Sequence, residues 1–200
     1  MFSFDQAQAE MGRQTTVLSD PVPKHPLLDG KPEIGRGEYS IVIDKCDDER
    51  VYKIVSSPAD YFLHTAEDRP RGLHFPVVYA DHGVIGRALS GYPFHLLEVE
   101  KLYPLTKGSP AASLATQLME VYWTSCLQWR NLGINMGRIA LHHMASTPFM
   151  FPIGRPMQET LKELSKFVEE YQILPDLLKA DNLMMRKDGT LVFSDPVFIA

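Results

Sequence analysis

The sequence predicts an α+β protein, with an N-terminal antiparallel five-stranded sheet carrying one helix and a mainly helical C-terminal part. From about residue 34 to residue 99, short β-rich runs are separated by glycine, aspartate and serine turns. After about residue 105, apolar residues instead recur at three- and four-residue steps, as on the buried face of a helix. We therefore expect an arm over residues 1–32, a sheet part over 33–104 and a helical part over 105–200.

The arm is polar and then interrupted by four prolines between residues 21 and 32. Proline lacks an amide donor and disfavours helix in the residue before it. The arm is therefore predicted to be extended, with one short helix at Asp5–Arg13.

Five strands are predicted in the sheet part. They are Ser40–Ile43, Val51–Val55, Phe75–Tyr79, Val84–Leu89 and Phe94–Val99. A helix should follow the second strand, because Ser57-Pro58 supplies a capping serine and a proline suited to the first turn. We expect it to run to about Asp68, and we expect Asp81-His82-Gly83 to form a turn between the third and fourth strands.

Two helices are predicted in the helical part. The first opens at Ser109-Pro110 and runs through Leu132 to a glycine cap at Gly133. The second spans Met157–Tyr171, and residues 134–156 between them follow no clear pattern. The apolar face of the second helix consists of Leu161, Leu164, Phe167 and Val168.

Charge and composition exclude several classes of function. The formal net charge of −5 argues against a nucleic-acid or anionic-membrane partner. The two cysteines, Cys46 and Cys126, fit no metal-ligand spacing. The N-terminus does not resemble a secretion signal, and no segment approaches the roughly 20 apolar residues that span a bilayer. A soluble cytoplasmic protein is the expectation.

A glycine pair opens the sheet part. Gly35 and Gly37, followed by Ser40, suit a hairpin whose backbone approaches phosphate groups and whose amide hydrogens point at their oxygens, although such pairs are also common in plain turns. A lysine in the following strand makes the pattern more specific. An alternating strand buries either Tyr52 or Lys53 beneath the hairpin, and a lysine there reaches the α- and β-phosphates of a nucleotide.

The terminal stretch Leu174–Ala200 carries a second group of polar residues. Asp176, Asn182 and Asp195 offer hard oxygen ligands of the kind that Mg2+ prefers. A short strand, a turn and the strand Thr190–Phe193 separate Asn182 from Asp195, so both can reach one metal cluster. Asp176 would accept the proton of an acceptor hydroxyl.

The chain resembles a protein-kinase-like phosphotransferase over about Glu33 to Phe198, because the glycine pair, the strand lysine and the terminal polar residues follow one another in the order found in that superfamily. The run Lys179–Met185 is similar to the kinase catalytic loop, and Ser194-Asp195-Pro196-Val197 stands where that superfamily has aspartate–phenylalanine–glycine. An aspartate–proline–valine ending is similar to the early serine/threonine kinases of short-tailed lytic bacteriophages.

The resemblance implies a kinase-like two-lobe fold with a truncated C-terminal lobe, ATP and Mg2+ as cofactors, and phosphorylation of bacterial host proteins in the host cytoplasm. Its catalytic residues would be Asp176, Lys53 and Lys179, and its metal ligands Asn182 and Asp195. The residues implied in nucleotide binding are Gly35, Gly37, Ser40, Lys53, Glu67, Glu98 and Glu100. The last two belong to a hinge segment, 98–102, whose backbone would pair with adenine.

The sequence leaves two candidates for the carboxylate that pairs with Lys53. A helix carboxylate should pair with Lys53, and Asp60 and Glu67 lie seven residues apart on one face of the predicted helix. We prefer Glu67.

The chain departs from the family pattern in three places. Six positions separate Asp176 from Asn182, one more than in the family, which leaves Asp181 as a weaker alternative base. Leu174-Pro175 replaces the usual histidine–arginine. The sequence stops five residues after Asp195, where helices that bind peptide substrate would follow, so we expect substrate docking to use other surfaces or a second chain.

Two other functions stay open. A non-enzymatic, kinase-derived binding module would inhibit or redirect a host protein, with or without bound nucleotide. A small-molecule kinase of the aminoglycoside-phosphotransferase type ranks last, because the chain lacks the residues for its acceptor pocket. The oligomeric state, including a homo-oligomer, is also open.

Two features outside this pattern carry weaker expectations. The aromatic and methionine residues between Trp123 and Phe151 should pack the helical part, but if exposed they would mark a protein interface. His142-His143 is not expected to bind metal, because adjacent residues point apart on a helix and no third ligand is spaced nearby.

Overall fold

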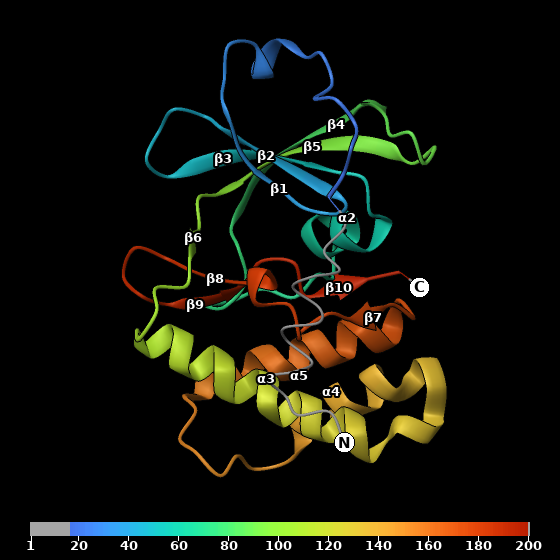
Figure 1. Ribbon diagram of the computed structural model, residues 1–200, viewed down its shortest axis with the longest axis vertical. Coiled ribbons are helices and arrows are strands. Elements are labelled where there is room, and N and C mark those ends of the chain that lie inside the picture. The colour runs from blue at the N-terminus through green and yellow to red at the C-terminus, as the bar shows by residue number, and fades with distance from the viewer. Residues whose placement is uncertain (1–16, 200) are drawn as a thin grey trace. The chain divides into compact units, whose positions relative to one another are not determined.

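The structure is a computed structural model that describes residues 17–199, so the helix expected at Asp5–Arg13 lies outside the described residues. The chain divides into two compact units (Figure 1). We call residues 17–67 and 77–101 the sheet unit, and residues 68–76 and 102–199 the helical unit. Each unit contains both helices and strands, which confirms the α+β class.

The sheet unit is built on five antiparallel strands. They are β1 (Glu33–Arg36), β2 (Ser40–Asp44), β3 (Arg50–Val55), β4 (Val78–Arg87) and β5 (Pro93–Glu100). Their order across the sheet is β1-β2-β3-β5-β4. Helix α2 (Pro58–Thr65) follows β3, and a short 3-10 helix, η1 (Pro26–Leu28), lies in the arm. The predicted sheet with one helix is confirmed.

The membership of the sheet differs from the prediction in two ways. β1 was not among the predicted strands, and two predicted strands, Phe75–Tyr79 and Val84–Leu89, are largely one strand, β4. Asp81-His82-Gly83 does not end that strand. Asp81 Oδ1 accepts a hydrogen bond from the Gly83 amide at 2.8 Å, Gly83 has a φ of 76°, and the register of β4 against β5 shifts at this point. The turn residues thus form an irregularity within a strand, as in a β-bulge.

Helix α2 begins as predicted and ends early. Ser57 Oγ accepts a hydrogen bond from the Asp60 amide at 3.4 Å, and Pro58 occupies the first turn. The last helical residue is Thr65 rather than Asp68, because Ala66 has an extended ψ of 144°. Glu67 therefore lies outside the helix.

Different segments cover the two faces of the sheet (Figure 1). One face, which we call the arm face, packs against Leu18, Val22, Leu27 and Leu28 of the arm. Its buried strand residues are Ile41, Ile43, Tyr52, Ile54, Phe94 and Leu96. The other, the helix face, buries Val51, Val55, Leu97 and Val99 together with Tyr61 of α2. Because side chains alternate along a strand, Tyr52 lies on the arm face and Lys53 on the helix face, and both are buried.

The helical unit contains three α-helices and two small antiparallel sheets among its described residues. Its helices are α3 (Pro110–Gln128), α4 (Met136–Ser146) and α5 (Arg155–Glu170), with the 3-10 helices η2 (Arg130–Asn135) and η3 (Ala180–Asn182). Its strands are β6 (Tyr103–Pro104), β7 (Leu174–Pro175), β8 (Leu183–Met185), β9 (Leu191–Phe193) and β10 (Val197–Phe198). The sheet orders are β6-β8-β9 and β10-β7.

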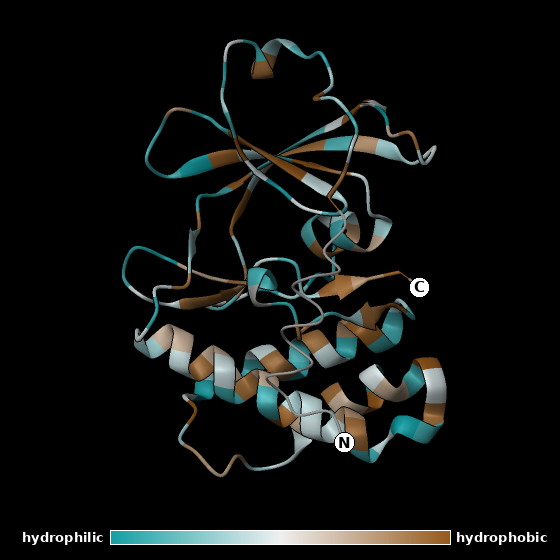
Figure 2. Ribbon diagram, in the orientation of Figure 1, coloured by the Kyte–Doolittle hydropathy of each residue, from teal (hydrophilic) through white to brown (hydrophobic). Residues whose placement is uncertain are grey.

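Both predicted helices of this unit are present. In α5 the four predicted apolar residues are buried, and Figure 2 shows hydrophilic and hydrophobic residues sharing the helix surface. In α3 the Ser109 cap is confirmed, since Ser109 Oγ accepts from the Ala112 amide at 3.1 Å. The helix ends at Gln128 rather than Leu132, and η2 follows, with Gly133 in a left-handed conformation (φ 57°).

Helix α4 lies in the region for which no structure was predicted. Ala140, Leu141, Met144 and Ala145 form its buried face. Its N-cap residue, Asn135, is of a favoured type but makes no capping side-chain hydrogen bond, and Gly137, a poor helix former, stands in the first turn, so the start of this helix is weakly marked in the sequence.

The aromatic and methionine residues between Trp123 and Phe151 are packed unevenly. Met144 is buried, whereas Met150 is fully exposed. Its two neighbours in the sequence, Phe149 and Phe151, pack their rings edge to face. Across residues 17–199, no helix is long and apolar enough to cross a membrane.

Candidate active site

In the sheet unit, one row of the register joins the glycine hairpin to Lys53. Gly35 pairs with Val42, Val42 with Lys53, and Lys53 with Leu97. Residues in one row face the same side of a sheet, and neighbouring strands are about 4.8 Å apart, so Gly35 and Lys53 lie about 10 Å apart on the helix face. The structure thus brings the glycine pair and the strand lysine together, as predicted.

The hairpin between β1 and β2 is closed by backbone hydrogen bonds. The Gly37 amide donates to Ser40 O at 2.9 Å, and the Ser56 amide, at the end of β3, donates to Tyr39 O at 2.8 Å. Ser40 itself is buried. Arg36, between the two glycines, pairs with Glu33 and donates to carbonyl oxygens of the arm, so its guanidinium is held away from the hairpin turn.

Neither glycine of the pair is required by the fold. Neither has a left-handed φ. A Cβ at Gly35 would meet Val42 at an ordinary 3.6 Å, and a Cβ at Gly37 would meet Ser40 Oγ at 3.4 Å. The described part of the chain therefore leaves room for a small side chain at both positions.

Lys53 forms a buried ion pair with Asp60 of α2. Lys53 Nζ lies 2.9 Å from Asp60 Oδ1 and 2.8 Å from Oδ2, and only 1% of the Asp60 surface is exposed. The preference for Glu67 as the helix carboxylate is thus wrong. Asp60 lies in the first turn of α2, whereas the helix ends before Glu67, which is exposed.

His64 completes this buried group and was not anticipated. Its Nδ1 lies 2.7 Å from the backbone oxygen of Asp60 and 3.1 Å from Oδ1. Burial raises the pKa of the Asp60 carboxyl, but the charges of Lys53 and His64 outweigh burial and hold that pKa well below its usual range. The spacing of four residues on a helix was the available signal for this contact.

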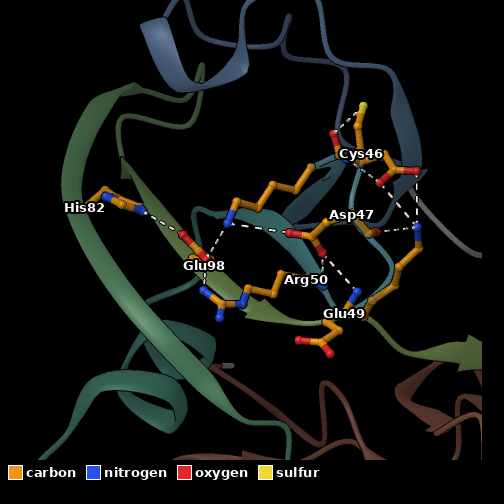
Figure 3. A network of polar contacts seen from close by, with 9 residues as sticks. Cys46, Asp47, Glu49, Arg50, His82 and Glu98 are labelled. Atoms are coloured by element: carbon orange, nitrogen blue, oxygen red, sulfur yellow. Dashed lines mark hydrogen bonds and ion pairs between the residues drawn. The ribbon is translucent and has the colours of Figure 1, made fainter.

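The predicted hinge residue Glu98 belongs to the opposite face. It pairs with Tyr52 in the register, and its carboxylate contacts Lys45 at 2.8 Å, Arg50 at 2.9 Å and His82 at 3.6 Å (Figure 3). Hydrogen bonds from Lys45 and Arg50 hold the pKa of Glu98 below its usual range. The structure does not bring this carboxylate together with Lys53.

The rest of the hinge segment is also engaged within the sheet unit. The Glu100 amide donates to Val77 O at 2.9 Å, and Glu100 Oε2 accepts from the Val77 amide. The Lys101 amide donates to Glu49 O at 2.8 Å. The pairing of this segment with adenine stays a prediction.

In the helical unit, two short strands hold Asp176 beside the loop of Asp195. β7 pairs with β10, and the Asp176 amide continues this pairing with a 2.7 Å hydrogen bond to Pro196 O. Lys179 Nζ lies 3.2 Å from Asp176 Oδ2. Asp181, the alternative base, is exposed.

Asn182 connects the three predicted polar residues of this unit. Its Nδ2 donates to Asp176 O at 2.8 Å, while its backbone oxygen accepts from the amides of Ser194 at 2.9 Å and Asp195 at 3.4 Å. Between Asn182 and Asp195, β8 and β9 pair as the predicted strand–turn–strand. Asp176, Asn182 and Asp195 are thus tied together by hydrogen bonds.

These residues suit a hard divalent cation such as Mg2+. Only the amide nitrogen of Asn182 can donate to a carbonyl oxygen, so Oδ1 is the side-chain atom left to act as a ligand. In the described part of the chain, no group of three or more His, Cys, Asp or Glu residues could hold a metal ion. An amide and a carboxylate fit Mg2+, which usually takes few protein ligands and completes its shell with waters and phosphate oxygens.

A tyrosine that the sequence did not single out supports the loop of Asp176. Tyr122 of α3 is buried, and its hydroxyl lies 3.4 Å from Pro175 O, one residue before Asp176. Gly137 of α4 makes room for that hydroxyl, because a Cβ there would lie 2.8 Å from it. Nothing in the helical spacing of Tyr122 distinguishes it from an ordinary core residue.

Neither a scan against models of known protein families nor a search of curated proteins finds a match for this chain. The two groups of polar residues and their geometry are therefore the basis on which a function is assigned.

Proposed function

We propose that the protein has a kinase-like two-lobe fold and is an ATP-dependent serine/threonine kinase. The observation that carries this proposal is the junction at Asn182, whose hydrogen bonds tie it to Asp176 and Asp195. A base and two ligands for a cation are the groups that phosphoryl transfer to a hydroxyl needs in one place. Bacterial host proteins as substrates rest on the resemblance to bacteriophage kinases alone.

In the helical unit, each polar residue has a separate task. Asp176 accepts the proton of the acceptor hydroxyl and orients it for in-line attack, and Lys179 lies within 3.2 Å of that carboxylate to balance the charge. Asn182 Oδ1 and the Asp195 carboxylate would hold Mg2+. When bound, the metal neutralises the charge that develops on the phosphate oxygens.

In the sheet unit, Lys53 would contact the α- and β-phosphates, with its ammonium group oriented by Asp60. The glycine pair supports this role, because a Cβ would fit within the chain at both positions. Close approach of a phosphate would account for glycine where the fold does not.

The test is phosphoryl transfer from labelled ATP in the presence of Mg2+ and a bacterial lysate. We expect labelled host proteins with the parent, a loss of about 10²–10⁴-fold in rate for Asp176→Ala, and no labelling for Asp195→Ala. Asp181→Ala tests the exposed alternative base and should keep the parent rate, whereas a loss confined to Asp181→Ala would assign the base to Asp181. Unchanged labelling by the Asp195→Ala protein would overturn the proposal.

A binding module without catalysis is the second candidate, and the extra residue between Asp176 and Asn182 favours it, because this residue moves the base away from the spacing of the kinase pattern. Its signature is thermal stabilisation by Mg-ATP without turnover, together with a stoichiometric partner from the lysate. Turnover by the parent that is lost in Asp195→Ala would exclude it.

A further inference from the structure

A buried group of three titratable side chains lies on the helix face of the sheet. Lys53, Asp60 and His64 have side chains that are 9%, 1% and 2% exposed. A charge removed from water is costly unless it is paired and hydrogen-bonded, so each member depends on the others. Lys53 and Asp60 are paired with each other, and the role of the buried His64 beside them is the question that follows.

The geometry settles which ring nitrogen of His64 carries a proton. Nδ1 faces the backbone oxygen of Asp60 at 2.7 Å and Asp60 Oδ1 at 3.1 Å. A backbone carbonyl oxygen can only accept, and so can an ionised carboxylate, so Nδ1 must be the donor. Its hydrogen bond goes to the Asp60 backbone oxygen, and this holds the ring so that Nδ1 also lies within ion-pair distance, 3.1 Å, of the carboxylate oxygen that Lys53 Nζ approaches at 2.9 Å.

We propose that His64 is a positioning residue for the nucleotide site, acting through Asp60. Its Nδ1–H fixes the rotation of the Asp60 carboxylate, and the carboxylate in turn fixes Lys53 Nζ where phosphates would bind. This inference rests on the proposed function for its consequence, but its mechanical part concerns Lys53 with or without nucleotide. At metal sites, removal of the partner that orients a ligating side chain typically costs about 10–100-fold in affinity or activity, and we expect an effect of that order here.

Local sequence explains why His64 can do this without distorting the helix. Asp60 and His64 are four residues apart in α2, so their side chains lie one above the other. The Ser57 cap binds the Asp60 amide and anchors the first turn from the other side. Both ends of the carboxylate-bearing segment are thereby held.

Two substitutions separate the hydrogen bond from the bulk of the ring. His64→Asn keeps an N–H donor close to the position of Nδ1, whereas His64→Leu keeps apolar volume and removes the donor. Thr65→Val is the matched control on the same helix, since it removes only a hydroxyl that bonds to the Tyr61 backbone oxygen. Thermal unfolding identifies any variant that is not folded.

The first readout is the 15Nζ NMR signal of Lys53 in the full chain without nucleotide. We expect this signal to move in His64→Leu and to return close to the parent position in His64→Asn, with Thr65→Val unchanged. An unchanged Lys53 signal in folded His64→Leu overturns the proposal, whatever the enzymatic activity. If His64→Leu does not fold, His64→Asn decides the case. A Lys53 signal that differs from that of the parent in folded His64→Asn then overturns the proposal.

The second readout is the dissociation constant of Mg-ATP. We expect it to rise about tenfold or more in His64→Leu and to stay within about threefold of the parent in His64→Asn. If the parent itself binds no Mg-ATP, the proposed function fails, while the Lys53 signal still decides whether His64 orients the ion pair. Equal nucleotide affinity in parent and His64→Leu overturns the positioning role.

Discussion

The two units hold their functional residues by different means. In the sheet unit, Lys53 is fixed by side chains, in an ion pair that is buried and backed by His64. In the helical unit, backbone hydrogen bonds shape the loops of Asp176 and Asp195, since one amide donates to Pro196 O and the other to Asn182 O, and the partly exposed Asp176 carboxylate pairs with Lys179. Removing one partner of a buried ion pair is costly, whereas a partly exposed ion pair contributes little to stability. The comparison predicts that stability and function are linked at the buried pair of Lys53 and Asp60 and separable at Asp176.

The largest effect is expected from Asp60→Ala. Removing the carboxylate leaves Lys53 buried without its partner, which destabilises by about 3–5 kcal/mol. Asp176→Ala keeps the amide hydrogen bond to Pro196 O and removes a partly exposed ion pair with Lys179, so it should change the free energy of unfolding by about 1 kcal/mol or less. Urea unfolding of both variants measures the difference, and equal losses would contradict the comparison.

A double substitution sharpens this result. Replacing the pair with apolar residues, Lys53→Met with Asp60→Leu, removes both charges at once and should recover most of the lost stability, because neither Lys53 nor Asp60 is then buried without its partner. The same protein should not bind Mg-ATP if Lys53 contacts the phosphates. Recovery of stability without nucleotide binding would show that the ion pair serves the site rather than the fold.

The second effect concerns the support behind Asp176. In Gly137→Ala, the new Cβ would lie 2.8 Å from the Tyr122 hydroxyl, and such overpacking costs about 1–3 kcal/mol, more than the alanine gains in a helix. Removing the hydroxyl by Tyr122→Phe should relieve the clash, so the double variant should unfold at a higher urea concentration than Gly137→Ala alone. Additive losses would indicate that the contact with Tyr122 is not the cause.

The third effect is a pH dependence from Asp60. Its pKa in the folded protein lies below the value of about 3.9 for an unfolded aspartate, so its stabilisation is fully present above that value and is lost as the pH falls. Between about pH 5 and pH 3, the unfolded chain takes up a proton that the folded chain does not. The free energy of unfolding should fall by up to about 1.4 kcal/mol per pH unit from this group. Urea unfolding at several pH values measures this. Between about pH 5 and pH 3 the free energy of unfolding should fall more steeply with pH in the parent than in the protein with both Lys53→Met and Asp60→Leu, and an equal fall in the two proteins would refute this.

Local signals in the sequence were reliable where the structure they specify is local. The serine–proline pairs at Ser57 and Ser109 start helices as predicted, because a cap needs only the next three residues. The prediction of a turn at Asp81-His82-Gly83 was wrong. These residues form the local hydrogen bond expected of a turn, but they do so inside β4, whose pairing with β5 cannot be predicted from the local sequence.

The site shows the same division. The order of Lys53, Asn182 and Asp195 could be taken from the sequence, and the hydrogen bonds at Asn182 fit it. The choice between Asp60 and Glu67 could not, because helical spacing puts both on one face and only the early end of α2 separates them. The Tyr122 hydroxyl was beyond prediction, since its contact with Pro175 depends on the packing of α3 against residues more than fifty positions away.

The smallest effect on stability is expected in the glycine hairpin, where stability and binding should separate most clearly. In Gly37→Ala, lower entropy of the unfolded chain is offset by a 3.4 Å contact with Ser40 Oγ, so the free energy of unfolding should change by no more than about 0.5 kcal/mol. Mg-ATP affinity should fall, because the methyl group would stand where a phosphate approaches. Gly30→Ala is the control with the reverse expectation. Because Gly30 has a φ of 70°, alanine there should lower the free energy of unfolding by about 1 kcal/mol and leave the affinity for Mg-ATP unchanged. Unaltered Mg-ATP binding by a stable Gly37→Ala protein would remove the hairpin from the nucleotide site and leave Lys53 as the sheet unit's only contribution supported by geometry in the described chain.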